Sequence, residues 1–107
     1  MICPERVASC SAQTNFEGTA GRYEVDVEYF DVSSGVSHFK AFVNGQLVDE
    51  WNADMVLPGA TPSADSSVRR RIKGLALRPG DVIRIDGIPD GGDRAPLDYV
   101  EVIKLAP

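Results

Sequence analysis

The stretch YEVDVEYFDVSSGVSHFKAFVNGQLVDEW, from Tyr23 to Trp51, contains the clearest strand and turn patterns of the chain. In its first seven residues, Tyr23 to Tyr29, apolar side chains occupy every second position and carboxylates lie between them. This period of two is typical of a strand with one face on a core and the other in water. A helix would spread the acids over its buried stripe. The segment therefore predicts a β-strand.

A hairpin is indicated further along the same stretch. Asn44-Gly45 separates the alternating segment at residues 38–43 from the one at residues 46–48. Asn and Gly tolerate the positive φ that both central residues of a type I′ turn require. We therefore predict that Asn44 and Gly45 form the two-residue turn of a β-hairpin.

The remaining chain contains more short alternating segments, separated by residues that favour turns. Further strands are predicted at residues 6–16, 67–77, 82–87 and 97–105. Gly74 is expected at a bulge or bend, and Arg78 to Asp81 form a turn. No segment has the period of an amphipathic helix. The period-two alternation predicts the following core residues: Tyr23, Val25, Val27, Phe39, Ala41, Val43, Ile83, Ile85, Tyr99 and Ile103. The sequence predicts an all-β, antiparallel sandwich, jelly-roll-like, with about seven strands or more in a single domain over residues 1–107.

The charge balance limits the kind of partner. The 107 residues include 11 Lys and Arg against 16 Asp and Glu, which gives a formal net charge of −5. This argues against a general nucleic-acid or anionic-membrane binder, because phosphate affinity rests on clustered cations. No apolar run reaches transmembrane length. In the basic run Arg69-Arg70-Arg71 we expect cross-strand pairs or solvated side chains, with contact to an acidic ligand such as a uronic acid as the alternative.

Two cysteines, Cys3 and Cys10, are too few for a disulfide scaffold. Their spacing fits neither a CxxC redox motif nor a zinc site. The two cysteines either form a disulfide that closes a small N-terminal loop, as is possible in an exported protein, or remain as two free thiols.

Catalysis needs side chains that this sequence does not combine. A nucleophilic Ser or Cys needs a positioned base, and the single histidine, His38, lies on the polar register of a strand beside Lys40. Glycoside hydrolysis needs a carboxyl with a raised pKa, and so small a sandwich has no deep cleft to desolvate one. We predict that the protein is not an enzyme.

Trp51 is the first candidate for a sugar-binding residue. It ends a predicted strand where a long loop starts, and Asn52 and Asp54 follow it. A sugar site needs an aromatic face against the pyranose ring and polar groups that reach adjacent hydroxyls, and this stretch offers both. The alternative is a tryptophan in the sandwich core.

Phe30-Asp31 is a second candidate, because Phe30 falls on the polar register of its strand. Further polar contacts are expected from a second Gly-rich loop, at Asp90, Asp93 and Arg94.

Calcium is the metal ion that suits this sequence best, because hard cations take carboxylate and carbonyl oxygens. Five aspartates lie in or next to predicted loops: Asp31, Asp54, Asp90, Asp93 and Asp98. None forms an EF-hand pattern, and the alternative role for acids near Gly is to form turns.

Four segments together resemble a known family. They are GRYEVDVEYFD (21–31), FKAFVNGQLVDEW (39–51), IKGLALRPGDVIRIDG (72–87) and LDYVEV (97–102). Their order and spacing are similar to those of the family-6 and family-35 carbohydrate-binding modules, which are small β-sandwiches appended to secreted polysaccharide-degrading enzymes.

The resemblance implies a ligand site on the loops at one end of the sandwich. It also implies a structural calcium held partly by the aspartate of the last strand, which is Asp98 here. Two positions depart from the family pattern, because the chain opens with Ile2-Cys3-Pro4-Glu5 in place of an E-x-E segment, and Pro96 stands where many members carry a ligand-binding Asn.

We therefore expect a non-catalytic carbohydrate-binding module of a longer, secreted protein, which holds an appended catalytic domain near a polysaccharide or oligosaccharide. Trp51 would stack on the sugar in this interpretation. The alternative is a docking sandwich that packs on a neighbouring domain and binds no sugar. An exposed Trp51 favours the first interpretation, and a buried Trp51 with an apolar patch favours the second.

Overall fold

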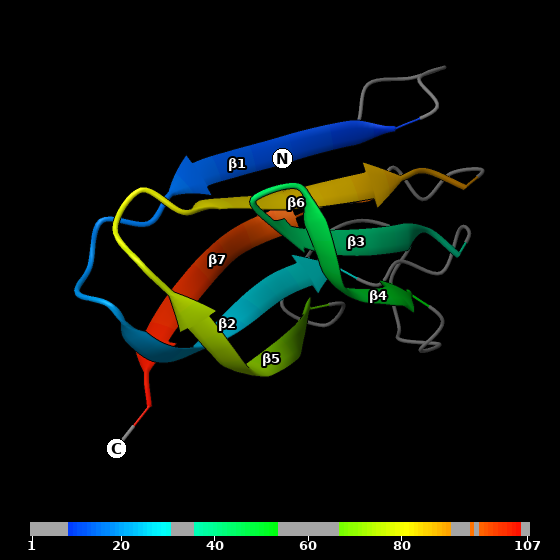
Figure 1. Ribbon diagram of the computed structural model, residues 1–107. Helices are drawn as coiled ribbons and strands as arrows, with labels where there is room; N and C mark the ends of the chain where they lie inside the picture. Colours follow the sequence, from blue (N-terminus) through cyan, green and yellow to red (C-terminus); the bar gives the residue numbers. More distant parts are fainter. Residues whose placement is uncertain (1–8, 31–35, 54–66, 91–94, 96, 106–107) are drawn as a thin grey trace.

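The computed structural model describes residues 9–30, 36–53, 67–90, 95 and 97–105. These residues form seven strands and no helix, arranged as two antiparallel sheets that face each other (Figure 1). The strands are β1 (Cys10–Asn15), β2 (Gly21–Phe30), β3 (His38–Val43), β4 (Gln46–Asn52), β5 (Ser67–Leu77), β6 (Val82–Ile88) and β7 (Leu97–Lys104). The predicted all-β sandwich is confirmed.

The four-stranded sheet has the order β1-β6-β3-β4, and the three-stranded sheet has the order β5-β2-β7. β2, which includes the alternating segment from Tyr23 to Tyr29, is thus the central strand of the smaller sheet. Its alternation places Val25 and Val27 between the sheets, where they are almost completely buried. Nothing in the described residues forms a helix long and apolar enough to cross a membrane.

The core lies between the sheets and contains most of the residues that alternation predicts. Buried as expected are Tyr23, Val25, Val27, Phe39, Ala41, Ile83 and Ile85. Val43 and Ile103 are half-buried, and Tyr99 is exposed. The expectation of a buried Tyr99 was therefore wrong.

A bulge at the start of β7 explains this error. Tyr29 pairs with Leu97, whereas Glu28 pairs with Tyr99, so the register shifts between these two pairs. The shift reverses the alternation after Leu97. Leu97 faces the core, and Tyr99 instead lies in the outward row beside Glu28.

The predicted turns are present. Asn44 and Gly45 have φ of 52° and 79° between β3 and β4, as a type I′ turn requires. Gly80 has φ of 93° in the turn between β5 and β6, and Asp81 N donates to Arg78 O at 3.1 Å. Gly74 has φ of 75° next to the register shift between β2 and β5, which confirms the expected bulge.

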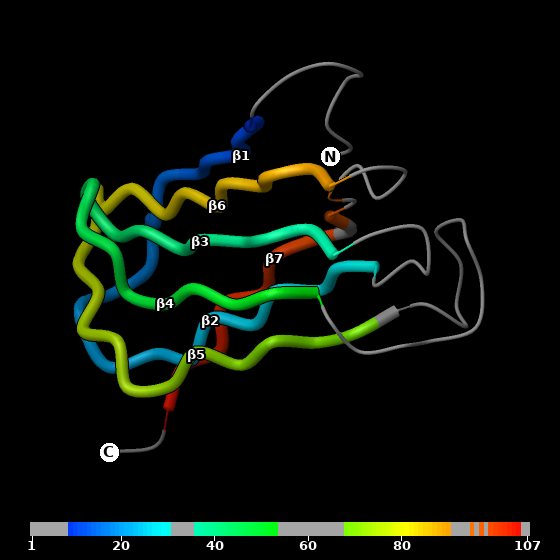
Figure 2. Tube along the Cα trace, turned by 90° about the vertical axis from the view of Figure 1, so that its right-hand side faces the viewer, coloured from blue at the N-terminus to red at the C-terminus, as the bar shows by residue number. Residues whose placement is uncertain are grey.

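Several strand ends meet at the end of the sandwich that lies opposite the Asn44-Gly45 turn (Figure 2). His38 pairs with both Asn52 and Ile88, and Phe30 pairs with Ser67. The ends of β2, β3, β4 and β6 are therefore brought together at the place where the sequence predicted a ligand site.

The cysteine question is answered for one of the two residues. Cys10, the first residue of β1, is disulfide-bonded. Cys3, the only other cysteine of the chain, lies outside the described residues.

Candidate functional site

Trp51 belongs to the core. Its side chain lies opposite Phe39 in the β3–β4 register, and the residue is only 7 % exposed. The indole stacks on Phe39 with centroids 5.7 Å apart and packs against Tyr29 at 5.9 Å. An indole buried between two rings offers no face to a pyranose. The expected exposed platform at Trp51 is therefore corrected to the alternative, a core tryptophan.

The remaining side of the indole faces Arg70, whose guanidinium carbon lies 5.2 Å from the ring centroid. Arg70 Nε and Nη2 donate to the Asp49 carboxylate at 2.9 and 3.1 Å, which joins β5 of one sheet to β4 of the other. The hydrogen bonds to Asp49 are the largest cause of the raised pKa of Arg70. The guanidinium is thus already paired, as the sequence suggested for this basic run.

Three of the expected ligand residues lie at the strand-end surface. Phe30 is half-buried, whereas Asn52 and Asp90 are exposed. Asn52 Oδ1 is 2.7 Å from His38 Nδ1, and Asp90 Oδ2 accepts from Val36 N at 2.8 Å. Lying outside the described residues are Asp31, Asp54, Asp93 and Arg94. The polar groups that are described here are therefore engaged with one another or with backbone.

The metal prediction rests on Asp98, which belongs to β7 but whose side chain is outside the described part. Among the side chains that the structure describes, no group of three or more His, Cys, Asp or Glu is placed to hold a metal ion. Calcium binding at Asp98 stays a prediction.

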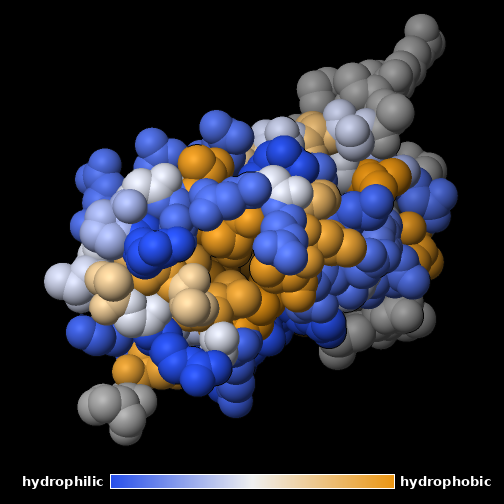
Figure 3. All heavy atoms as spheres, viewed as in Figure 1, coloured by the Kyte–Doolittle hydropathy of each residue, from blue (hydrophilic) through white to orange (hydrophobic). Residues whose placement is uncertain are grey.

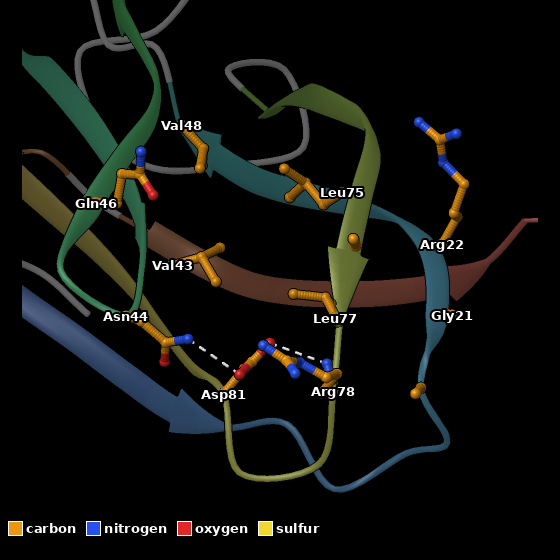
Figure 4. A pocket seen from close by; sticks show the side chains of 12 residues that line it. Gly21, Arg22, Val43, Asn44, Gln46, Val48, Leu75, Leu77, Arg78 and Asp81 are labelled. Carbon is orange, nitrogen blue, oxygen red and sulfur yellow. Dashed lines mark hydrogen bonds between the residues drawn. The ribbon is translucent and has the colours of Figure 1, made fainter.

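A large apolar cleft opens between the sheets at the edge formed by β4 and β5 (Figure 4). Its volume is about 590 Å³, and Val43, Val48, Leu75 and Leu77 form its apolar walls. Figure 3 shows hydrophobic side chains gathered in a hollow on this face, with hydrophilic ones around it. The cleft has no aromatic side chain in its lining.

The turn end of this cleft is closed by a hydrogen-bonded clamp. Asn44 Nδ2 donates to Asp81 Oδ1 at 3.0 Å, and Asn44 Oδ1 accepts from Val82 N at 2.9 Å. Asp81 Oδ2 also accepts from Arg78 N at 2.9 Å. The hydrogen bond from Asn44 lowers the pKa of Asp81, with the backbone bond as the second cause. The hairpin turn and the β5–β6 turn are therefore held together.

All eight aromatic residues of the chain lie within the described ranges. Five are buried: Phe16, Tyr23, Tyr29, Phe39 and Trp51. Phe30 and Phe42 are half-buried, and the Arg84 guanidinium carbon lies 4.2 Å from the centroid of the Phe42 ring. Tyr99 is the most exposed of the eight, at 42 %. Sequence reasoning missed it because the bulge at Leu97 leaves no mark in the hydrophobic pattern.

A smaller opening of about 300 Å³ lies beside Tyr99, at the other lateral edge of the sandwich. Its lining comes from β1, β6 and β7: Ala12, Gln13, Thr14, Ile83, Ile85, Leu97, Tyr99 and Val100. This opening combines an apolar floor, an exposed aromatic ring and uncharged polar side chains.

Comparison with known proteins finds no matching family model. The chain is 40 % identical over 96 residues to a probable alpha-glucuronidase A of Aspergillus terreus, a match that covers 84 % of this chain and 11 % of that protein. The corresponding protein of Aspergillus oryzae is 36 % identical over 99 residues, covering 87 % and 12 %. The chain is similar to a small part of alpha-glucuronidase A. It spans only 11–12 % of the length of these relatives.

Two solved structures share the fold. One is the CBM36-1 domain of a multidomain xylanase from the hindgut metagenome of Trinervitermes trinervoides, with a TM-score of 0.53 and 12 % identity over 92 % of this chain and 72 % of that domain. The other is latent PorU from Porphyromonas gingivalis, with a TM-score of 0.52 and 19 % identity over 92 % of this chain and 10 % of that one. At these identities the likeness concerns the β-sandwich fold alone.

Proposed function

We propose that this chain is a non-catalytic carbohydrate-binding module of a larger, secreted carbohydrate-active enzyme. The observation that carries the proposal is the similarity to an 11–12 % portion of alpha-glucuronidases, in a chain whose β-sandwich is also that of a xylanase CBM36-1 domain. A segment of this size, appended to a catalytic domain, would raise the local concentration of that domain on a polysaccharide.

The state of the single histidine supports a non-catalytic role. His38 Nδ1 is 2.7 Å from Asn52 Oδ1, and its Nε2 is 3.3 Å from Glu50 Oε1. Both ring nitrogens are therefore engaged with neighbouring side chains, and within the part of the chain that the structure describes no Ser or Cys is among these partners, as an activated nucleophile would require.

The test is a binding screen with a matched assay for hydrolysis. The purified domain is run in native gels that contain xylan, glucuronoxylan, a soluble cellulose derivative or galactomannan, and the same mixtures are assayed for released reducing ends. We expect retarded migration with at least one polysaccharide and no release of sugar. Tryptophan fluorescence is a poor reporter here, because Trp51 is buried.

A docking role is the second candidate, and two observations favour it. Trp51 is buried, and the cleft between β4 and β5 is apolar and lacks an aromatic ring. Branched aliphatic walls suit protein side chains better than a pyranose. The partner would be a neighbouring domain of the parent enzyme, because the chain covers only 11–12 % of its relatives.

Val48→Asp tests this second candidate, because Val48 lines the cleft and is half-buried. If the cleft docks on a neighbouring domain, the full-length enzyme that carries Val48→Asp should be cleaved faster between the domains in limited proteolysis. It should also melt at a lower temperature than the full-length enzyme without the substitution. The control is Leu47→Asp, at the adjacent exposed position outside the cleft. Equal behaviour of the two variants would argue against docking in the cleft.

A further inference from the structure

We propose that the lateral opening between β1 and β7 is the saccharide subsite of this module, with the Tyr99 ring as its stacking surface and an uncharged pyranose as its ligand. This inference rests on the proposed carbohydrate-binding function. It places the sugar site at the lateral edge of the sandwich and not at the end opposite the Asn44-Gly45 turn, where the sequence predicted it. Its basis is the coincidence of an exposed ring, an apolar floor and uncharged polar groups in one opening.

The aromatic inventory singles out Tyr99. A pyranose binds through its axial C–H groups to an aromatic face, so the ring must be accessible. All eight aromatic residues are described, and Tyr99 is the most exposed of them, at 42 %. Phe30 and Phe42 are both half-buried, and the Arg84 guanidinium carbon lies 4.2 Å from the Phe42 ring centroid, closer than the 6.0 Å between Arg69 and the Tyr99 centroid.

The Tyr99 ring is also held in place before a ligand arrives. Arg69 Nη2 donates to the Tyr99 hydroxyl at 2.8 Å, and the Arg69 guanidinium carbon lies 6.0 Å from the ring centroid. Arg69 in turn donates to Asp26 at 3.1 Å and to Glu28 at 3.2 Å, and Asp26 is only 1 % exposed. A ring fixed in this way loses little conformational freedom on binding, which favours affinity.

The opening supplies the other groups that a sugar requires. Exposed Gln13 and Thr14 of β1 offer an amide and a hydroxyl, each of which can donate and accept hydrogen bonds to ring hydroxyls. Ile83 and Ile85 of β6 form the apolar floor. A volume of about 300 Å³ lies at the lower end of the range for small-ligand sites, which fits a short stretch of a glycan chain.

Local charge indicates an uncharged sugar. Three carboxylates, those of Asp26, Glu28 and Glu101, lie within 3.1 to 3.6 Å of the single guanidinium of Arg69. The group beside Tyr99 thus carries more negative than positive charge, and Glu101 is half-exposed. A uronate placed there would meet like charge, so unsubstituted pyranose residues are favoured over acid-bearing ones.

The experiment is calorimetric titration of the domain with neutral xylohexaose and with a xylo-oligosaccharide of equal length that carries one glucuronate. Tyr99→Ala is expected to weaken binding by about 5- to 150-fold, the loss of one aromatic stacking contact. Tyr99→Phe keeps the ring and loses only the hydroxyl, so it should retain most of the affinity. We expect the glucuronate-bearing sugar to bind no more tightly than the neutral one.

Two further variants make the result interpretable if Tyr99→Ala perturbs the fold. Gln13→Ala, on a different strand and outside the Arg69 network, should also weaken binding. Leu47→Ala removes another exposed apolar side chain, one that lies on β4 and outside the opening, and should change nothing. Circular dichroism and melting curves confirm that each variant is folded.

The outcomes separate this inference from the proposed function. If the parent domain binds no glycan, both fall. If the parent domain binds and folded Tyr99→Ala and Gln13→Ala bind equally well, the saccharide subsite lies elsewhere and only this inference is overturned. Tighter binding of the glucuronate-bearing sugar would overturn the assignment of an uncharged ligand.

Discussion

Replacement of Trp51 by alanine tests whether the single tryptophan is a core residue or a sugar platform. The side chain is 7 % exposed, stacks on Phe39 at 5.7 Å and carries Arg70 at 5.2 Å from its centroid. Truncation of a buried aromatic residue to alanine costs about 3–5 kcal/mol, because the transfer free energy is lost and a cavity remains. Loss of the cation–π contact adds about 0.5–1 kcal/mol.

Such a loss is a large part of the ~5–15 kcal/mol stability of a typical domain. The assay is urea unfolding followed by far-ultraviolet circular dichroism, since the variant has no tryptophan left to report. Trp51→Phe, which keeps a ring in the cluster, should lose less, and Leu47→Ala at an exposed site should stay within about 0.5 kcal/mol of the parent. A Trp51→Ala protein that is as stable as the parent but has lost glycan binding would refute the assignment of Trp51 to the core.

Three further predictions concern the turns and the metal. Gly45→Val should lower the free energy of unfolding by on the order of 1–2 kcal/mol, because φ is 79° there and the strain lies in the backbone; an unchanged melting midpoint would argue against it. Asp81 has a lowered pKa in the folded protein, so its stabilising effect is complete above the unfolded value of 3.8 and is lost as pH falls through the folded pKa. Urea unfolding midpoints are measured from pH 2 to pH 6, which is about two units on either side of the unfolded pKa. On acidification they should therefore fall less steeply in Asp81→Asn than in the parent. If calcium binds through Asp98, it should raise the melting temperature of the parent and not that of Asp98→Ala. A chelator that changes the melting temperature of neither protein would argue against the predicted calcium site.

Much of the fold could be predicted from the sequence, because local chemistry determines it. Alternation in β2 places Val25 and Val27 between the sheets, and Asn44-Gly45 provides the two positive φ angles of the hairpin. Gly74 and Gly80 likewise take the left-handed conformations that their positions in a bulge and a turn suggested. In each case a few neighbouring residues are sufficient to specify the backbone.

The candidate site could not be predicted to the same extent, because it depends on register between distant strands. In the sequence, Trp51 lies where a predicted strand meets a predicted loop, and only its pairing opposite Phe39 shows that the indole faces the core. Tyr99 was expected inside because strict alternation was assumed along β7, and the bulge after Leu97 reverses it. Asp31, Asp54, Asp93 and Arg94 lie outside the described residues, so their contacts with a ligand stay predictions.

The network around Arg69 was likewise invisible in the sequence. Its three carboxylate partners and Tyr99 come from β2 and β7, far from Arg69 along the chain. The basic run predicted pairing across strands, but the partners follow only from the order β5-β2-β7.

Native affinity electrophoresis in gels with and without neutral xylan, combined with an assay for reducing ends, shows whether this domain binds carbohydrate without cleaving it. We expect that the parent domain migrates more slowly in the xylan gel, that Tyr99→Ala migrates at its sugar-free rate, and that no reducing ends are released. Unchanged migration of the parent domain in xylan and in every other polysaccharide of the panel would contradict the claim and leave docking on a neighbouring domain as the function to pursue.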